Sequence, residues 1–223
     1  MTVLHLAEEG EAADLAAFLS RLLHYDRSAA VRLQAAGTAL AVFGRPPSFE
    51  VLAIRAARLA KPYEDGLDVT LDRTVSAGEL LEAVDEAAAT AVVPGAVTGP
   101  PWAGVLPPRG GWRTEPGLPA PDALRAMVGA AVAEFRARTE ELGPEGRTRA
   151  ALDLIGRDIW SRTVGDTSLP VRAVHAAQSL GFLRGGGEPA LLSAGSWLRL
   201  RTPYGSVAVR TAGLGALGVS VSR

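Results

Sequence analysis

The sequence predicts an α+β protein, with an N-terminal mainly antiparallel sheet and helices, and a C-terminal helical unit ending in a β-hairpin. Three observations support this fold class. Hydrophobic residues form 48% of the 223 residues, which is enough for a sizeable core. Strand-like and helix-like patterns alternate before position 94, whereas helical patterns dominate after position 121. Eight of the fifteen prolines lie between Pro94 and Pro121 and separate the two units.

The first unit, residues 1–93, begins with a short predicted strand over Thr2–Leu6. An amphipathic helix follows over Glu9–Tyr25, because its leucines and Phe18 recur at helical spacing and its first turn is acidic. The next two segments, Ala29–Ala36 and Ala39–Arg45, flank a Gly-Thr pair. They are therefore expected to form a β-hairpin.

Two further strands are predicted over Phe49–Leu59 and Asp68–Val75, where β-branched and aliphatic residues are frequent. Ser76 is followed three residues later by Glu79, a spacing typical of a helix-capping box. This box is expected to open a helix that continues to about Ala89. The unit is thus predicted to be a mainly antiparallel sheet covered by helices.

Residues 94–121 are predicted to form a proline-rich strap without regular structure, since each proline fixes φ and removes a backbone donor. The segment also contains Trp102 and Trp112. Tryptophan is rare in solvated tethers because it buries a large apolar surface. We therefore expect an ordered strap whose tryptophans anchor on a folded surface.

The second unit, residues 122–223, contains three predicted helices and a hairpin. The first helix begins at Pro121 and ends near Gly143, where glycine and proline stop it. The hairpin is expected because two alternating segments flank a Pro-Tyr-Gly turn. The remaining predicted elements are the helices Glu145–Val164 and Pro170–Leu180 and the hairpin strands Ser196–Thr202 and Ser206–Thr211.

Composition and motifs exclude several kinds of site. The chain has no cysteine, which rules out disulfides, thiolate metal sites and cysteine nucleophiles. His5, His24 and His175 lack a second ligand at metal-binding spacing, and no Gly-x-Ser-x-Gly elbow is present. The glycine runs Gly185–Gly187 and Gly213–Gly218 lack the strand–turn–helix context of a phosphate or dinucleotide site. No catalytic residue, metal ligand or cofactor is therefore predicted.

Charge is distributed unevenly although the net charge is only −1. Residues 1–93 carry a net charge of −6 and residues 146–223 a net charge of +6. Opposite ends of this kind either dock on each other or leave the basic end free for an anion. Arginine accounts for 22 of the 23 basic residues, and asparagine is absent, which indicates a GC-rich genome rather than selection for an arginine surface.

The basic end suggests one specific alternative, a winged-helix-like DNA-binding protein. In that fold the third helix enters the major groove and the hairpin touches phosphates. The alanine-rich third helix offers bases few hydrogen bonds, so nucleic acid is not the favoured partner. Candidate contacts to nucleic acid or another anion are Arg172, Arg199, Arg201 and Arg210.

Four segments of the chain carry a resemblance to a known group of proteins. They are Leu106–Trp112, Ile159–Arg162, Ala176–Leu183 and Gly195–Leu200. Together they resemble an uncharacterised protein family of high-GC actinobacteria. The resemblance implies a cytoplasmic bacterial protein and implies no activity.

The function favoured by the sequence is a non-enzymatic binding or interaction protein of unidentified partner, including an unknown protein or a second copy of itself. The alternatives are the winged-helix DNA binder and an enzyme or small-molecule binder with an unrecognised site. No secretory signal or membrane-spanning stretch is visible, so a cytoplasmic location without membrane contact is expected.

Overall fold

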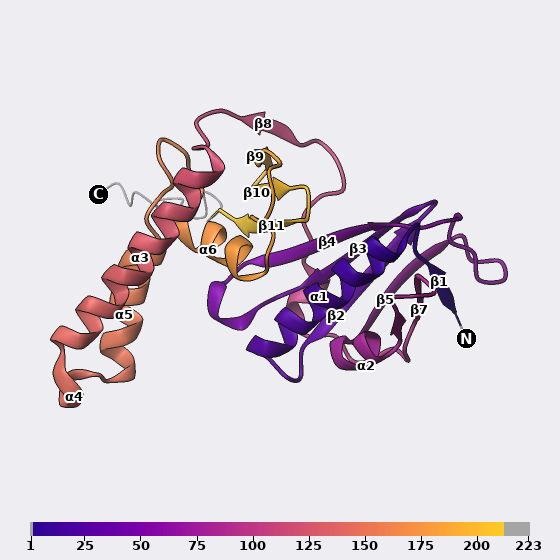
Figure 1. Cartoon of the computed structure of the whole chain (residues 1–223), viewed down its shortest axis with the longest axis horizontal. Coiled ribbons are helices and arrows are strands. Elements are labelled where there is room, and N and C mark those ends of the chain that lie inside the picture. Colours follow the sequence, from indigo (N-terminus) through magenta and orange to yellow (C-terminus); the bar gives the residue numbers. More distant parts are fainter. Residues whose placement is uncertain (1, 212–223) are drawn as a thin grey trace, which may run out of the picture.

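The computed structural model describes residues 2–211, which form the predicted α+β fold (Figure 1). Its centre is an eight-stranded antiparallel sheet in the order β5-β2-β3-β4-β11-β10-β9-β8. The glycine run Gly213–Gly218 lies outside the described residues. The strands of this sheet are β2 (Ala30–Ala36), β3 (Ala39–Gly44), β4 (Leu52–Arg58), β5 (Thr70–Ser76), β8 (Arg113–Glu115), β9 (Ala190–Ala194), β10 (Trp197–Thr202) and β11 (Gly205–Arg210).

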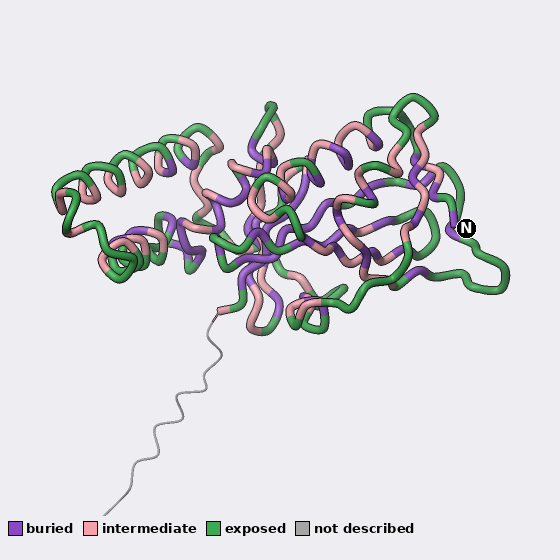
Figure 2. Tube along the Cα trace, turned by 90° about the horizontal axis from the view of Figure 1, so that it is seen from below, coloured by how far each residue is buried: buried purple, intermediate pink, exposed green. Residues whose placement is uncertain are grey.

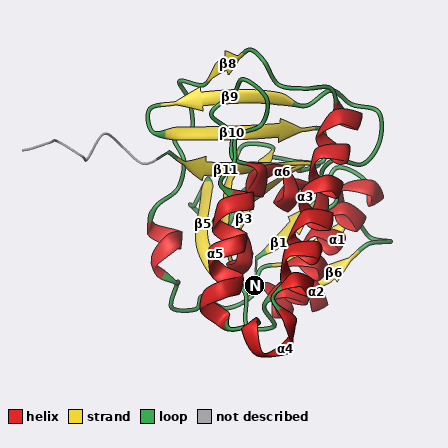
Figure 3. Ribbon diagram, turned by 90° about the vertical axis from the view of Figure 1, so that its left-hand side faces the viewer, coloured by secondary structure: helices red, strands yellow, loops and turns green. Residues whose placement is uncertain are grey.

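The large sheet contains strands from both ends of the chain. The predicted C-terminal hairpin is β10–β11, and β11 also pairs with β4, which places Ala208 opposite Leu52. Figure 3 shows β8 to β11 running nearly across the direction of β3 and β5, so the sheet is strongly twisted. Beyond β10 the sheet continues with β9, which pairs with β10, and then β8, which pairs with β9. These two short strands were not predicted from the sequence.

A smaller sheet joins β1 (Val3–His5), β7 (Thr90–Val92) and β6 (Val84–Asp85). The prediction of one helix from Ser76 to Ala89 is wrong beyond Glu82. The helix α2 spans only Ala77–Glu82, and the chain then enters β6 of the smaller sheet. The Ser76 hydroxyl accepts the Glu79 amide as predicted. The chain then turns at Asp85, whose carboxylate accepts the Ala88 amide at 2.9 Å, and Ala89 adopts a positive φ of 50°. The turn lets β7 pair with β1, and these tertiary contacts override helix propensity.

One face of the large sheet is covered by helices and is called the helix face. It lies under α1 (Glu9–Tyr25), α2 and α6 (Val171–Ser179), which contact β4, β5 and β11 respectively. Alternate residues of each strand point to this side. Leu33, Val42, Leu200 and Val207 are among them, and each is fully buried in the main core.

The opposite face of the large sheet is called the strap face, because the first part of the strap (residues 94–121), with the short 3₁₀ helix η2 (Pro101–Gly104), packs on it. The last part of the strap contains β8, the edge strand of the same sheet, so the strap is not wholly without regular structure as predicted. Trp102 and Leu106 of the strap pack against a second, smaller cluster on the sheet. That cluster consists of Phe43, Leu52, Ile54 and Ala208.

Two helices form an arm that projects from the sheet (Figure 1). They are α3 (Pro121–Glu141) and α5 (Arg149–Trp160), joined through α4 (Gly143–Gly146). Most arm residues are exposed or half-buried, as Figure 2 shows. The second helix begins at Arg149 rather than at the predicted Glu145, because the Thr148 hydroxyl caps it by accepting the Ala151 amide at 3.2 Å. A salt bridge of 2.6 Å between Arg162 and Glu134 supports the arm.

The described residues do not form the winged helix considered from the sequence. The buried face of α6, including Ala173 and Val174, packs into the main core. The hairpin β10–β11 is flanked by β9 on one side and β4 on the other, so it does not project as a wing. The 3₁₀ helix η1 (Pro47–Phe49) also contacts α6. Within residues 2–211, no helix has the length and apolar character needed to cross a bilayer.

Candidate functional site

The strap face contains a groove of about 490 Å³ between the sheet and the strap. Its floor is formed by small side chains, including Ala36, Ala39, Ala41 and Ala56. Ala41 and Ala56 are directly opposite each other on β3 and β4. Alanine is depleted in strands because it fills little of the space above a pleated sheet. This alanine floor therefore leaves a hollow where larger residues would close the surface.

The walls of the groove are mainly apolar. Phe43 and Ile54 line it from the sheet, and Pro107 and Pro108 line it from the strap. Phe43, Ile54 and Pro107 are buried, so this part of the wall is held by packing. A groove with apolar walls and few polar groups is typical of small-molecule sites.

The strap is fastened to the sheet beside the groove by Arg32. Its guanidinium donates to the Ala103 carbonyl and forms two hydrogen bonds with Asp72, of 2.7 and 2.8 Å. Gln34 donates to the same carboxylate at 3.1 Å. The hydrogen bond from Arg32 is the main reason why the pKa of Asp72 is lowered. Asp72 lines the groove, but its charge is already compensated by a cation.

Arg199 lines the groove from β10 and has a different environment. Its side chain is half-buried, and its Nε is buried without a hydrogen-bond partner in residues 2–211. Burial lowers the pKa of Arg199, and the like charge of Arg201 lowers it further. The guanidinium carbon lies 5.7 Å from the centre of the Trp112 ring, within reach of a cation–π contact. Arg199 is thus a desolvated cation that faces a hollow.

A second arginine, Arg109, lines the groove from the strap and is exposed. Its charge contributes to the lowered pKa of Asp72. The lining therefore combines two arginines with one aspartate that is already paired. Among the described residues that line it there is no histidine, serine, lysine or tyrosine, and the hydroxyl side chain present, Thr70, is exposed.

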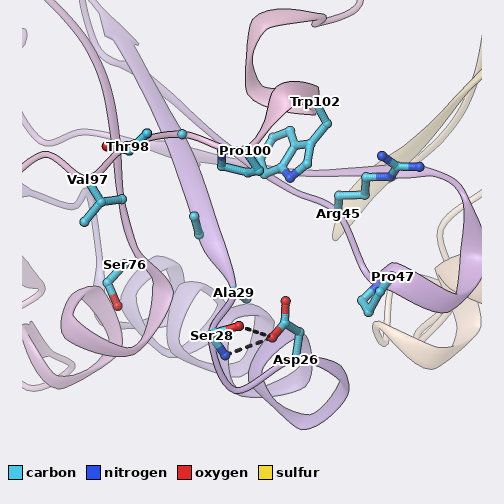
Figure 4. Close-up of a pocket in the computed structure, with 12 residues that line it drawn as sticks. Asp26, Ser28, Ala29, Arg45, Pro47, Ser76, Val97, Thr98, Pro100 and Trp102 are labelled. Atoms are coloured by element: carbon cyan, nitrogen blue, oxygen red, sulfur yellow. Dashed lines mark hydrogen bonds between the residues drawn. The ribbon is translucent and has the colours of Figure 1, made fainter.

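A second hollow, of about 620 Å³, lies at the other end of the strap. Figure 4 shows Trp102 and Pro100 on one side of it and Asp26 and Ser28 on the other. The Asp26 carboxylate accepts hydrogen bonds from the Ser28 amide and hydroxyl, of 2.9 and 2.7 Å. Because Arg45 is exposed and Asp26 serves a local turn, this hollow has no desolvated polar group comparable to Arg199.

The structure places the four predicted anion contacts on two sides of the sheet. Arg199, Arg201 and Arg210 share the strap face, because Trp197 is paired with Arg210 and residues 197, 199 and 201 alternate together. Arg172 belongs to α6, which covers the helix face. The four arginines therefore form no continuous basic surface.

The histidines, which were not expected to form a site, do not line the groove. His175 stacks on Trp160 at 4.5 Å between ring centres and meets the edge of Phe49 at 5.0 Å. His24 meets Tyr25 at 5.4 Å. In the part of the chain that the structure describes, no three histidine, aspartate or glutamate side chains converge as a metal site would require.

Comparison with known protein families divides the chain at the strap. Residues 1–104 match a domain of unknown function (DUF8010), and residues 107–214 match another domain of unknown function (DUF8185). Both halves of the chain match uncharacterised domain families. No curated protein matches the chain. The boundary between the two matches falls between Gly104 and Pro107, and both matched regions contribute residues to the groove.

Sequence reasoning selected Arg199 but missed the rest of the groove. Gln34, Asp72 and Arg109 come from separate segments that only the fold brings to one surface. One signal was available in the sequence, the alanines of β3 and β4 within otherwise β-branched or aliphatic strands. A second was the Pro-Pro-Arg string of the strap, whose three residues line the groove.

Proposed function

We propose that the protein is a non-enzymatic binding protein that holds a small molecule with an apolar body between the strap and the sheet. The observation that carries this proposal is the 490 Å³ groove with an alanine floor and an ordered apolar wall. Its volume falls within the range of about 300–1,000 Å³ that is usual for ligand sites. The cytoplasmic location predicted from the sequence is part of the proposal.

Two features favour binding over catalysis. The groove's one carboxylate, Asp72, is hydrogen-bonded to Arg32 and Gln34, so its lowered pKa makes it a poor general base. The described lining also holds no histidine or serine that Asp72 could orient. The side chains present supply shape, apolar contact and charge, which are the requirements of recognition.

The proposal is tested with the uncharged fluorophore phenylnaphthylamine, whose emission rises in apolar surroundings. We expect saturable one-to-one binding to the full chain. Ala41→Leu fills the floor of the groove and should weaken binding by at least about tenfold, since the ligand loses both space and contact area. Ala56→Leu, on the opposing strand, should weaken probe binding in the same way.

The matched control is Ala133→Leu, the same substitution at an exposed position of the arm. It should leave probe binding unchanged. Circular dichroism and thermal unfolding establish that each variant is folded. Equal binding of the probe to all four proteins contradicts the proposal, because it locates the probe outside the groove.

A further inference from the structure

Arg55 and Arg199 both have an Nε that is buried without a hydrogen-bond partner in residues 2–211, but the rest of each guanidinium has different surroundings. Arg55, on β4, has a side chain that is only 7% exposed, and it contacts Glu11 at 2.8 Å and Asp14 at 3.2 Å. It also donates to the Tyr204 carbonyl at 3.0 Å. The fold thus supplies this buried cation with counterions, as the high cost of desolvating a charge requires.

Arg199 receives no such partner from the described chain. No acidic side chain in residues 2–211 forms a salt bridge with it, and the like charge of Arg201 adds to the lowering of its pKa. A guanidinium carries five donors, and one of them, the Nε–H, is already withdrawn from solvent here. Burying donors without acceptors is unfavourable, so the free protein holds Arg199 at an energetic cost.

An anion in the groove would remove that cost. Carboxylate, sulfonate and phosphate oxygens accept paired hydrogen bonds from a guanidinium, and these bonds are stronger than neutral ones. Arg109 adds a second positive charge on the strap side, while the charge of Asp72 is compensated by Arg32. The Trp112 ring, 5.7 Å from the Arg199 guanidinium, shields it on one side and helps to hold its position.

From this arrangement we infer that the ligand is an amphiphilic organic anion, whose acidic group binds Arg199 and whose apolar body lies on the alanine floor. The inference rests on the proposed function, because it names the chemical class of the molecule in the same groove. The apolar body follows from Ala41, Ala56, Phe43 and Pro107, and the anionic group follows from the Arg199 guanidinium, which has no acidic partner among residues 2–211.

The test compares two fluorophores that share a ring system. Anilinonaphthalene sulfonate carries a sulfonate, and phenylnaphthylamine is its uncharged analogue. We expect the sulfonate to bind at least about tenfold more tightly, which is the factor expected from one charge-assisted hydrogen bond. Arg199→Met should remove this preference, because the sulfonate then meets no desolvated cation in the groove.

Arg210→Met is the matched control, because it changes the net charge by the same amount as Arg199→Met. Arg210 is exposed on the same face of the sheet and does not line the groove. It should retain the preference for the sulfonate. A second readout is stability: Arg199→Met should unfold at the same or a higher urea concentration, since it removes a desolvated cation. If Arg199 had a purely structural role, replacing it with methionine would lower the urea midpoint instead.

The outcomes separate this inference from the proposed function. If both probes bind the groove equally and Arg199→Met changes neither, the anionic ligand is excluded while groove binding stands. If neither probe binds saturably, or if Ala41→Leu affects neither, both proposals are overturned. Selective loss of sulfonate binding in Arg199→Met, with Arg210→Met unchanged, establishes the anion site.

Discussion

The helix face of the large sheet carries Leu33, Val42 and Leu200, which are fully buried beneath helices. The strap face of the same strands carries Ala41 and Arg199, which are only half-buried. A helix presents a broad apolar stripe that fills the space above a sheet, whereas an irregular strap touches it at a few points. The helix face therefore contributes most of the buried core, and the strap face retains a hollow of about 490 Å³.

The two faces should differ most in how much free energy of unfolding is lost when a side chain is replaced. Leu200→Ala on β10 removes a fully buried side chain from the helix face and should cost about 2–5 kcal/mol in the free energy of unfolding. Urea denaturation monitored by tryptophan fluorescence measures this cost. The neighbouring change Arg199→Met, on the strap face, should cost nothing by the same measurement. Similar costs for the two variants would show that the faces are equally filled.

A second comparison adds atoms to the two sides of β3. A side-chain carbon at Gly44 would collide with Leu22 on α1, which is 1% exposed and has no room to move. Gly44→Ala should therefore cost about 1–3 kcal/mol. The side chain at position 41 lines the groove, so Ala41→Val should change the free energy of unfolding by less than about 0.5 kcal/mol. A large cost for Ala41→Val would mean that the hollow is not available space.

The attachment of the strap should depend on Trp102 more than on Trp112. Trp102 packs on the smaller cluster of Phe43, Leu52, Ile54 and Ala208 (the Phe43 cluster), while the Trp112 indole donates locally to the Pro108 carbonyl at 2.9 Å. Trp102→Ala should lower stability by about 1–2 kcal/mol, because a half-buried ring is lost. It should also speed tryptic cleavage at Arg109 under native conditions, whereas Trp112→Ala should affect stability less. Unchanged cleavage in Trp102→Ala would remove this residue as the anchor.

The smallest expected effect concerns the pH dependence of stability and the desolvated side chain of His175. Burial lowers the pKa of His175 below its ordinary value of 6.5. The unfolded chain therefore takes up the proton first, so the stabilising contribution of neutral His175 is complete above pH 6.5 and is lost as pH falls from there through the folded pKa. His175→Phe keeps an aromatic ring against Trp160 and should flatten the decline. The measurement is the urea midpoint of unfolding at a series of pH values in this range. If the midpoint falls equally with pH in the wild-type protein and in His175→Phe, the prediction is wrong.

Local patterns in the sequence were sufficient for most elements of the fold. The helix α1 occupies the predicted Glu9–Tyr25, because one apolar stripe and an acidic first turn suit only a helix. The hairpins β2–β3 and β10–β11 also lie where turn residues separate alternating strands. The predicted helix beyond Glu82 was wrong, because pairing of β7 with β1 outweighed a weak helical preference.

The sequence by itself determined which residues alternate on each strand, and hence that Trp197, Arg199 and Arg201 share one face of β10. Only the tertiary structure decided what covers that face. The strap crosses it because Arg32 and the Phe43 cluster hold Ala103, Trp102 and Leu106. The groove then joins residues from β2, β3, β4, β5, β10 and the strap. Such long-range juxtaposition depends on strand order and twist, which residue periodicity does not encode.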